Sequence, residues 1–254
     1  DLPVFSKETM EASGIKNLIK SFKLAMQNKP YRFIVMAYLF TNIATAIISA
    51  IGIHVFTYTF SLNNTQIGIV FGSLFGVSIL SQPAWVKISE KIDKKPAAVL
   101  GIFFSIIGSL IFMILVFNRS QIQGQILFLV IFAVISGFGA GALFSLPFSM
   151  IADTIDFDEL ETGKRMEGVY YGTLTLFYKF SQSVSIFFLG ILLDILKFDS
   201  SLDKQPEGTI LALGLTISIG SFIVLSLAGI SYSRYTLNKK SISAVQEKIR
   251  KRPE

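Results

Sequence analysis

The sequence predicts an all-α membrane protein with six transmembrane helices. Of its 254 residues, 52% are hydrophobic and only 16% are charged, whereas soluble domains carry about a quarter charged residues. Apolar stretches long enough to cross a bilayer, about 20 residues each, recur six times along the chain. The charged residues gather in the connections and at both ends, which is where a membrane protein meets water.

We therefore divide the chain into three parts. Residues 1–30 form an amphipathic linker in which apolar residues alternate with lysines, residues 31–232 form the six-helix bundle, and residues 233–254 form a basic tail. Such a linker is typical of a helix lying on the membrane surface, although a solvated segment without regular structure fits equally well. The expected spans are residues 31–60, 66–86, 97–117, 124–150, 168–196 and 209–232.

Three spans carry further patterns. In the first span, polar residues share one helical face, namely Thr41, Asn42, Thr45 and Ser49. The second has a glycine every four residues, Gly68, Gly72 and Gly76, and such a bare stripe predicts close approach of another helix. The fourth contains Gly137, Gly141 and Pro147, which suit either close packing or a bend.

The basic residues predict the orientation. Of the 23 Lys and Arg residues, 19 lie in the two ends and in the connections 87–96 and 151–167, whereas three lie in the other connections and Lys179 lies within a span. Basic residues are enriched in cytoplasmic loops. We therefore expect both ends and the acidic 151–167 connection to be cytoplasmic, in the inner membrane of a bacterium.

Lys179 is the main functional candidate. It lies about 17 Å into the fifth span, near the middle of a hydrocarbon core about 30 Å thick, where an ionisable residue is a functional hypothesis by default. Snorkelling to the membrane surface fits a lysine at a helix end better than one at this depth. Polar neighbours recur at helical spacing: Tyr171, Thr175, Tyr178, Gln182 and Ser183. This stripe predicts a water-filled cavity that takes a polar solute.

A buried ammonium needs a partner, and the sequence offers none at that depth. The only acidic residue within a span, Asp194, lies about 22 Å away along the same helix. We therefore expect a further chain segment to face Lys179, and the sequence to be a fragment.

The connection before this span is dense in charge. Asp153, Asp156 and Glu159 precede Lys164 and Arg165, and opposite charges at facing helix ends can form a salt bridge that opens and closes a gate. A solvated polar turn is the plainer interpretation. The acidic spacing does not match a calcium-binding loop.

Several classes of function are excluded or disfavoured. The chain has no Cys and a single His, so thiol chemistry and multi-histidine metal sites are not expected. The basic residues lie in the connections and at the ends, where they indicate membrane orientation, so we expect no nucleic-acid partner. No hydrolase, zinc-protease, phosphate-loop or dinucleotide motif occurs in a suitable context. We expect no enzyme and no bound metal or cofactor.

The segment D-T-I-D-F-D-E-L-E-T-G-K-R, followed by an aromatic-rich span with a lysine, resembles the glycoside–pentoside–hexuronide:cation symporters. These form the melibiose-permease-like branch of the major facilitator superfamily. The combination of Asp153, Asp156, Glu159, Arg165 and Lys179 carries the resemblance. It implies that the chain is helices seven to twelve of a twelve-helix transporter, with residues 1–30 matching the central cytoplasmic loop and an N-terminal six-helix half missing.

The resemblance also implies roles. The protein would move a sugar or glycoside together with Na⁺ or H⁺ by alternating access around a midplane site, and the main cation ligands would lie outside this chain. Substrate would meet Phe144, Tyr171, Thr175, Tyr178, Lys179 and Gln182, whereas Asp153, Asp156, Glu159 and Arg165 would form a cytoplasmic gate. Leu174 stands where melibiose permeases have a polar residue, which disfavours melibiose itself.

Two alternatives remain open. The same superfamily contains carriers of lysolipids, for which a wide apolar path beside the lysine would be expected. A protein with only a structural or regulatory role in the membrane is the other alternative, and the polar stripe around Lys179 disfavours it.

Overall fold

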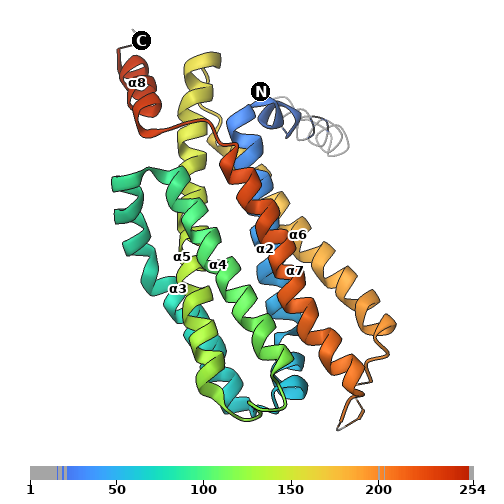
Figure 1. Ribbon diagram of the computed structural model, residues 1–254. Helices are drawn as coiled ribbons and strands as arrows, with labels where there is room; N and C mark the ends of the chain where they lie inside the picture. Colours follow the sequence, from blue (N-terminus) through green and yellow to red (C-terminus); the bar gives the residue numbers. More distant parts are fainter. Residues whose placement is uncertain (1–15, 17–18, 20–21, 200, 203, 252–254) are drawn as a thin grey trace, which may run out of the picture.

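The protein is a bundle of helices (Figure 1). The computed structural model describes residues 16, 19, 22–199, 201–202 and 204–251, and the described part contains no strand. Its helices are α2 (Lys29–His54), which continues into the π-helical turn η1 (Val55–Thr59), α3 (Asn64–Ile92), α4 (Lys94–Phe117), α5 (Ile126–Thr162), α6 (Glu167–Ile195), α7 (Glu207–Ser233) and α8 (Lys239–Arg250). The proposed surface helix of residues 1–30 falls largely outside the described residues, although residues 22–27 are helical.

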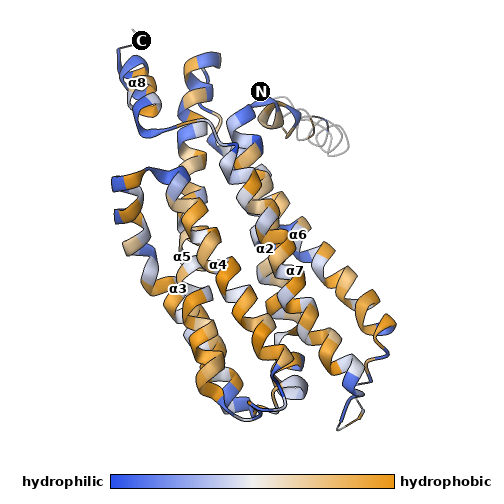
Figure 2. Ribbon diagram, viewed as in Figure 1, coloured by the Kyte–Doolittle hydropathy of each residue, from blue (hydrophilic) through white to orange (hydrophobic). Residues whose placement is uncertain are grey.

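Six of the described helices are long and apolar enough to cross a membrane, which confirms the predicted spans. They are α2 with η1, α3, α4, α5, α6 and α7. Figure 2 shows hydrophobic residues along the middle of the bundle and hydrophilic residues gathered toward its two ends. We name the end that carries residues 87–96, 151–167 and 233–251 the basic end.

The order of packing leaves two helices at the edges. Helix α5 packs on α3 and α4, α7 packs on α2 and α4, and α6 packs mainly on α2. As a result, α3 and α6 lie at opposite edges of the bundle (Figure 1). Within the most apolar part of α6 only 11% of the residues are buried, compared with 28–56% for the other spanning helices. One side of α6 is therefore left open by the described part of the chain.

Two predicted loops are largely helical, which corrects the expected boundaries. Helix α3 continues to Ile92 through the segment expected as a basic loop, and α5 continues to Thr162 through the first half of the acidic segment. Nothing in either stretch breaks a helix until Asp93 and Gly163, which adopt positive φ angles of 81° and 72°. With 37 residues, α5 is about 55 Å long, so its charged last turns project beyond an apolar core about 30 Å thick.

The basic tail contains a helix that the sequence reading did not place. Asn238 and Ser241 form a capping box that starts α8. Ile242 and Val245 are buried, and α8 packs against α5. Asp93 accepts a hydrogen bond from the backbone of Lys239 at 2.9 Å. The tail is thus fixed to the bundle at two elements, α5 and the α3–α4 corner.

Glycines in α5 allow the central helices to approach closely. A Cβ atom at Gly137 would meet the backbone of Leu74 in α3, and one at Gly139 would lie 2.6 Å from the carbonyl oxygen of Gly101 in α4. Gly141 similarly packs against Ser78 and Ser81 of α3. The close-packing interpretation of Gly137 and Gly141 is therefore confirmed. By contrast, no described atom lies within 4 Å of the Cβ positions at Gly68, Gly72 and Gly76, so the helix expected on that stripe is none of those described.

Candidate functional site

The polar stripe of α6 lies on the open side of the bundle. Lys179 and Thr175 are exposed, and 41% of the surface of Tyr178 is accessible. Tyr171 and Gln182 are half-buried. The Thr175 and Ser183 hydroxyls donate to the carbonyl oxygens of Tyr171 and Lys179 one turn earlier. They thus satisfy their own donors while still presenting oxygen lone pairs outward.

Lys179 lies about 18 Å from the start of α6, near the middle of the span. No ion pair within the described part of the chain involves its ammonium group; the pairs found there belong to Lys94, Arg119, Arg165 and Lys251. The described part of the bundle thus pairs Lys179 with no acidic side chain.

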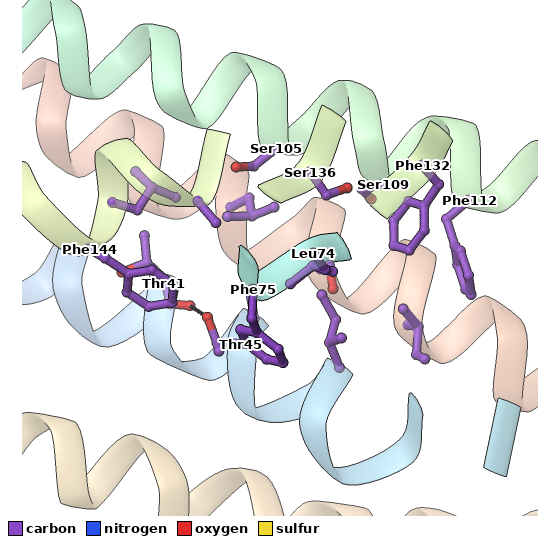
Figure 3. Close-up of a pocket in the computed structure, with 17 residues that line it drawn as sticks. Thr41, Thr45, Leu74, Phe75, Ser105, Ser109, Phe112, Phe132, Ser136 and Phe144 are labelled. Atoms are coloured by element: carbon purple, nitrogen blue, oxygen red, sulfur yellow. Dashed lines mark hydrogen bonds between the residues drawn. The ribbon is translucent and has the colours of Figure 1, made fainter. Parts of the chain in front are cut away.

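Phe144 occupies a different place from the α6 residues. It lies on α5 and lines a cavity of about 60 Å³ among α2, α3, α4, α5 and α7, to which no α6 residue contributes (Figure 3). Among the α6 residues, Tyr171 reaches α5: its hydroxyl donates to the carbonyl oxygen of Phe148 at 3.4 Å, one turn beyond Phe144. The described structure therefore does not gather the six predicted substrate residues around one pocket.

The cavity has walls of hydroxyl groups and phenyl rings. Figure 3 shows Thr41 and Thr45 on one side of it, and Ser105, Ser109 and Ser136 across from them. The rings come from Phe75, Phe112, Phe132 and Phe144. Because Thr45, Phe75 and Phe144 are half-buried while Phe112 and Phe132 are at most 2% exposed, the cavity opens between α2, α3 and α5 and ends deep inside the bundle.

Sequence reasoning missed most of this cavity. It marked the polar face of the first span, which includes Thr41 and Thr45, but assigned no site to it. It assigned no role to Ser105 and Ser109 on α4 or to Ser221 on α7, which come from two separate apolar spans. A single serine in such a span is common, so only the packing of the helices shows that these hydroxyls converge.

A second, apolar cleft of about 370 Å³ lies between α2, α6 and α7. Its walls are almost entirely aliphatic or aromatic, including Ile43, Ile47, Phe188 and Leu192. The cleft begins at Val184 on α6, five residues beyond Lys179. An amphiphile whose polar group bound near Lys179 would therefore find an apolar path along the same helix.

Arg165 joins the ends of α5 and α6 at the basic end. Its guanidinium group contacts Asp156 at 3.0 Å, Glu159 at 2.7 Å and Glu167 at 2.7 Å. Hydrogen bonds to Glu159, and then to Glu167 and Asp156, hold the pKa of Arg165 well above its ordinary value. The group therefore stays charged, and its separation from the carboxylates has to come from movement of the helices.

Asp153 pairs with a partner that the sequence reading did not name. Its carboxylate accepts from the Lys94 ammonium group at 2.7 Å, which joins α5 to the α3–α4 corner rather than to Arg165. The longer α5 explains the difference, because Asp153 and Asp156 both lie on a continuing helix and reach different neighbours. Asp156 also accepts from Gln246 of α8 at 2.8 Å. The predicted gate residues thus fall into two clusters, the Lys94–Asp153 pair and the carboxylates around Arg165. Among the described residues, no group of three or more His, Cys, Asp or Glu side chains could hold a metal ion.

Fold and site together define an integral membrane protein: a six-helix bundle with one open helix, a lysine on that helix at mid-membrane, and charged clusters joining the helix ends. Comparison with known proteins agrees with this class. A family described as MFS/sugar transport protein matches residues 2–239. The chain therefore belongs to this family of transporters within the major facilitator superfamily.

Three relatives illustrate the range of the family. An uncharacterized symporter from Synechocystis is 28% identical over 190 residues, covering 74% of this chain and 34% of the relative. The sodium-dependent lysophosphatidylcholine symporter 1 of Xenopus tropicalis is 26% identical over 240 residues, covering 91% and 44%. A candidate sulfoquinovose importer from Escherichia coli is 27% identical over 239 residues, covering 93% and 49%. The chain thus spans half the length of these relatives or less.

Proposed function

We propose that this chain is the C-terminal half of a twelve-helix secondary transporter. In this proposal the whole protein carries a sugar or glycoside together with Na⁺ or H⁺ by alternating access. The observation that carries the proposal is Lys179, which lies exposed at mid-membrane on a helix that the described bundle leaves open. An ammonium group facing lipid at that depth would be costly, so a second half with a polar interior would cover it.

The missing half would pack on both edge helices. It would cover the open side of α6, and a helix from it would lie on the bare stripe of Gly68, Gly72 and Gly76 on α3. The counter-charge for Lys179 would come from a carboxylate of that half or from an anionic group of the substrate. Two six-helix halves rocking around a midplane site would then expose the substrate to each side in turn.

The hydroxyl- and phenyl-lined cavity beside Phe144 supports a sugar as the substrate. Hydroxyl groups recognise sugar hydroxyls, and an aromatic ring offers a flat apolar face for stacking. The candidate sulfoquinovose importer among the relatives is named for a sulfonated sugar. A sulfonated sugar would place its anionic group at Lys179 and its neutral hydroxyl groups toward this cavity, whose walls carry no charged side chain.

A lysolipid or another amphiphile is the second candidate, and the apolar cleft along α6 favours it. The cleft, of about 370 Å³, is lined in part by α6, the helix that carries Lys179. If a charged head group bound near the lysine, the acyl chain of the same molecule would lie in that cleft. The lysophosphatidylcholine symporters among the relatives also carry a molecule with a phosphate group and an acyl chain. A purely structural role is disfavoured by membership in a family of transporters.

We further propose that the Arg165 cluster and the Lys94–Asp153 pair hold the basic end closed, with that end in the cytoplasm. Both join helix ends within this half, and opening of the inner side would require these helix ends to shift against one another. Because Arg165 is 48% exposed at its side chain, each of its pairs would contribute only about 0.2–1 kcal/mol. Such weak pairs can break and re-form during a transport cycle.

The test is an uptake assay on the full-length protein in proteoliposomes. The panel contains a neutral glycoside, a sulfonated hexose and a lysophospholipid, each measured with an Na⁺ gradient and an H⁺ gradient imposed separately. Uptake of a sugar driven by one gradient supports the leading proposal. Uptake of the lysophospholipid alone replaces it with the second candidate, and uptake that ignores both gradients contradicts cation coupling.

A further inference from the structure

Two buried serine hydroxyl groups face the 60 Å³ cavity without a hydrogen-bond partner in the described structure. They are Ser136 on α5, which is 9% exposed, and Ser221 on α7, which is 2% exposed. Buried hydroxyl groups are nearly always hydrogen-bonded to protein or to ordered water. Finding two of them around one cavity therefore points to a ligand rather than to an isolated packing fault.

The remaining hydroxyl groups of the cavity have spare acceptor capacity. The hydroxyls of Thr41, Thr45 and Ser105 each donate to a carbonyl oxygen of their own helix, and Ser109 donates across to Ser218 of α7 at 2.7 Å. A hydroxyl that donates once still holds oxygen lone pairs that can accept. A guest that both donates and accepts would satisfy these oxygens and the two free serines together.

The chemistry of the walls excludes a charged guest. The lining consists of hydroxyl-bearing, aliphatic and aromatic residues, and it contains no acidic, basic or histidine side chain. An ion placed there would have no counter-charge, and a buried charge without one is strongly disfavoured. Since a water needs roughly 10–15 Å³ of such a volume, the cavity of about 60 Å³ has room for about four to six water molecules.

We propose that the cavity is a binding site for a small cluster of water molecules that connects Ser136 and Ser221 to the hydroxyl groups of α2 and α4. The cluster hydrates the interface of four helices deep in the bundle, behind the half-buried ring of Phe144. Because no titratable group lines the site, the cluster is neutral and serves as neither a cation site nor a proton-binding site. The cluster is proposed for the protein without bound substrate, and in that state it does not depend on which substrate is transported.

X-ray hydroxyl-radical footprinting tests the water-cluster proposal, because X-rays produce hydroxyl radicals from bound water, and these radicals oxidise the buried side chains beside it. The full-length protein is irradiated in lipid nanodiscs, and oxidation is read by mass spectrometry at Phe112 and Phe132, which line the cavity. Phe56 and Phe60 serve as matched controls, since they are at most 1% exposed but do not line it. We expect the lining rings to be oxidised about fivefold faster than the controls, since ordered water lies beside them. Equal, low rates at all four rings would overturn the proposal.

The two serines are tested in the double variant Ser136→Ala/Ser221→Ala. Oxidation of Phe112 and Phe132 should fall to the rate of Phe56 and Phe60. Ser185→Ala is the control variant, because Ser185 is also buried without a partner but lines the apolar cleft instead; it should leave the rates unchanged. Undiminished oxidation in the double variant would show that the two serines do not hold the water. If the double variant fails to fold, the comparison within the unaltered protein still decides whether the cavity is hydrated.

Discussion

At the scale of single residues, Lys179 is the side chain on which the proposed transport site depends. Its charge stands on the open side of α6, without an acidic partner in the described part of the chain. A positive charge in that position is costly unless an acidic side chain or a bound substrate pairs with it. The polar residues on either side of it, such as Thr175 and Gln182, would surround whatever group binds the ammonium.

We predict that Lys179→Ala in the full-length protein abolishes gradient-driven uptake while membrane expression stays normal. The loss follows because the site would lack the positive charge that α6 places at mid-membrane, whereas an alanine on this exposed face of α6 does not disturb packing within the described bundle. Uptake into cells and the amount of protein in the membrane are measured together. Lys204→Ala, in the exposed connection before α7, should transport normally. Normal driven uptake by Lys179→Ala would rule out its assignment to the site.

Arg165 and Asp156 should differ in their effects on the transport cycle. Arg165→Gln removes contacts to three carboxylates, whereas Asp156→Asn leaves Arg165 paired with Glu159 and Glu167. We therefore expect the Arg165 variant to slow uptake more strongly, by several-fold, in a time course of substrate entry. Exchanging the two charges should not restore activity, because an aspartate at position 165 would face Glu159 and Glu167. Equal rates in both single variants and the unaltered protein would refute the gate.

At the scale of elements, the sequence predicts helices well and their ends less well. Hydrophobicity marks a span because the bilayer core is apolar, so the six spans follow directly from composition. It carries no information about where a helix ends outside the membrane, which is why α5 extends twelve residues past the predicted end at residue 150. The sequence also does not show which helices contact one another, because residues far apart in the chain meet only after folding. The sequence therefore singles out Lys179 as a candidate, which stays a prediction, but it does not reveal the cavity, whose hydroxyl groups come from four helices.

The glycines of α5 provide a test at this scale. We predict that Gly137→Ala destabilises the protein by about 1–3 kcal/mol, as expected for overpacking, because the added methyl group meets backbone atoms of Leu74 that cannot move aside. Thermal unfolding of the full-length protein in detergent should shift to lower temperature. Gly208→Ala is the control, since no described atom lies within 4 Å of its Cβ position. An unchanged melting temperature for Gly137→Ala would contradict the close approach of α3 and α5.

At the scale of the whole molecule, the two ends of the bundle differ in charge and in architecture. The basic end carries α8 and the last turns of α5. It also carries the Arg165 cluster, the Lys94–Asp153 pair and the contact of Asp93 with Lys239. The opposite end consists of short connections in which Arg119 pairs with Glu207 at 2.6 Å. Because basic residues are retained on the cytoplasmic side, this asymmetry predicts a single orientation in the membrane.

We predict that a cysteine at Ser120 is labelled by a membrane-impermeant maleimide in intact cells, whereas a cysteine at Ser243 is labelled only after the cells are permeabilised. Ser120 lies in the connection between α4 and α5, and Ser243 lies on α8; both are exposed. The chain contains no cysteine of its own, so within this half only the introduced thiol reports. The reverse pattern would invert the orientation and place the Arg165 cluster outside. Labelling of both sites in intact cells would show that α8 does not lie across the membrane from the α4–α5 connection.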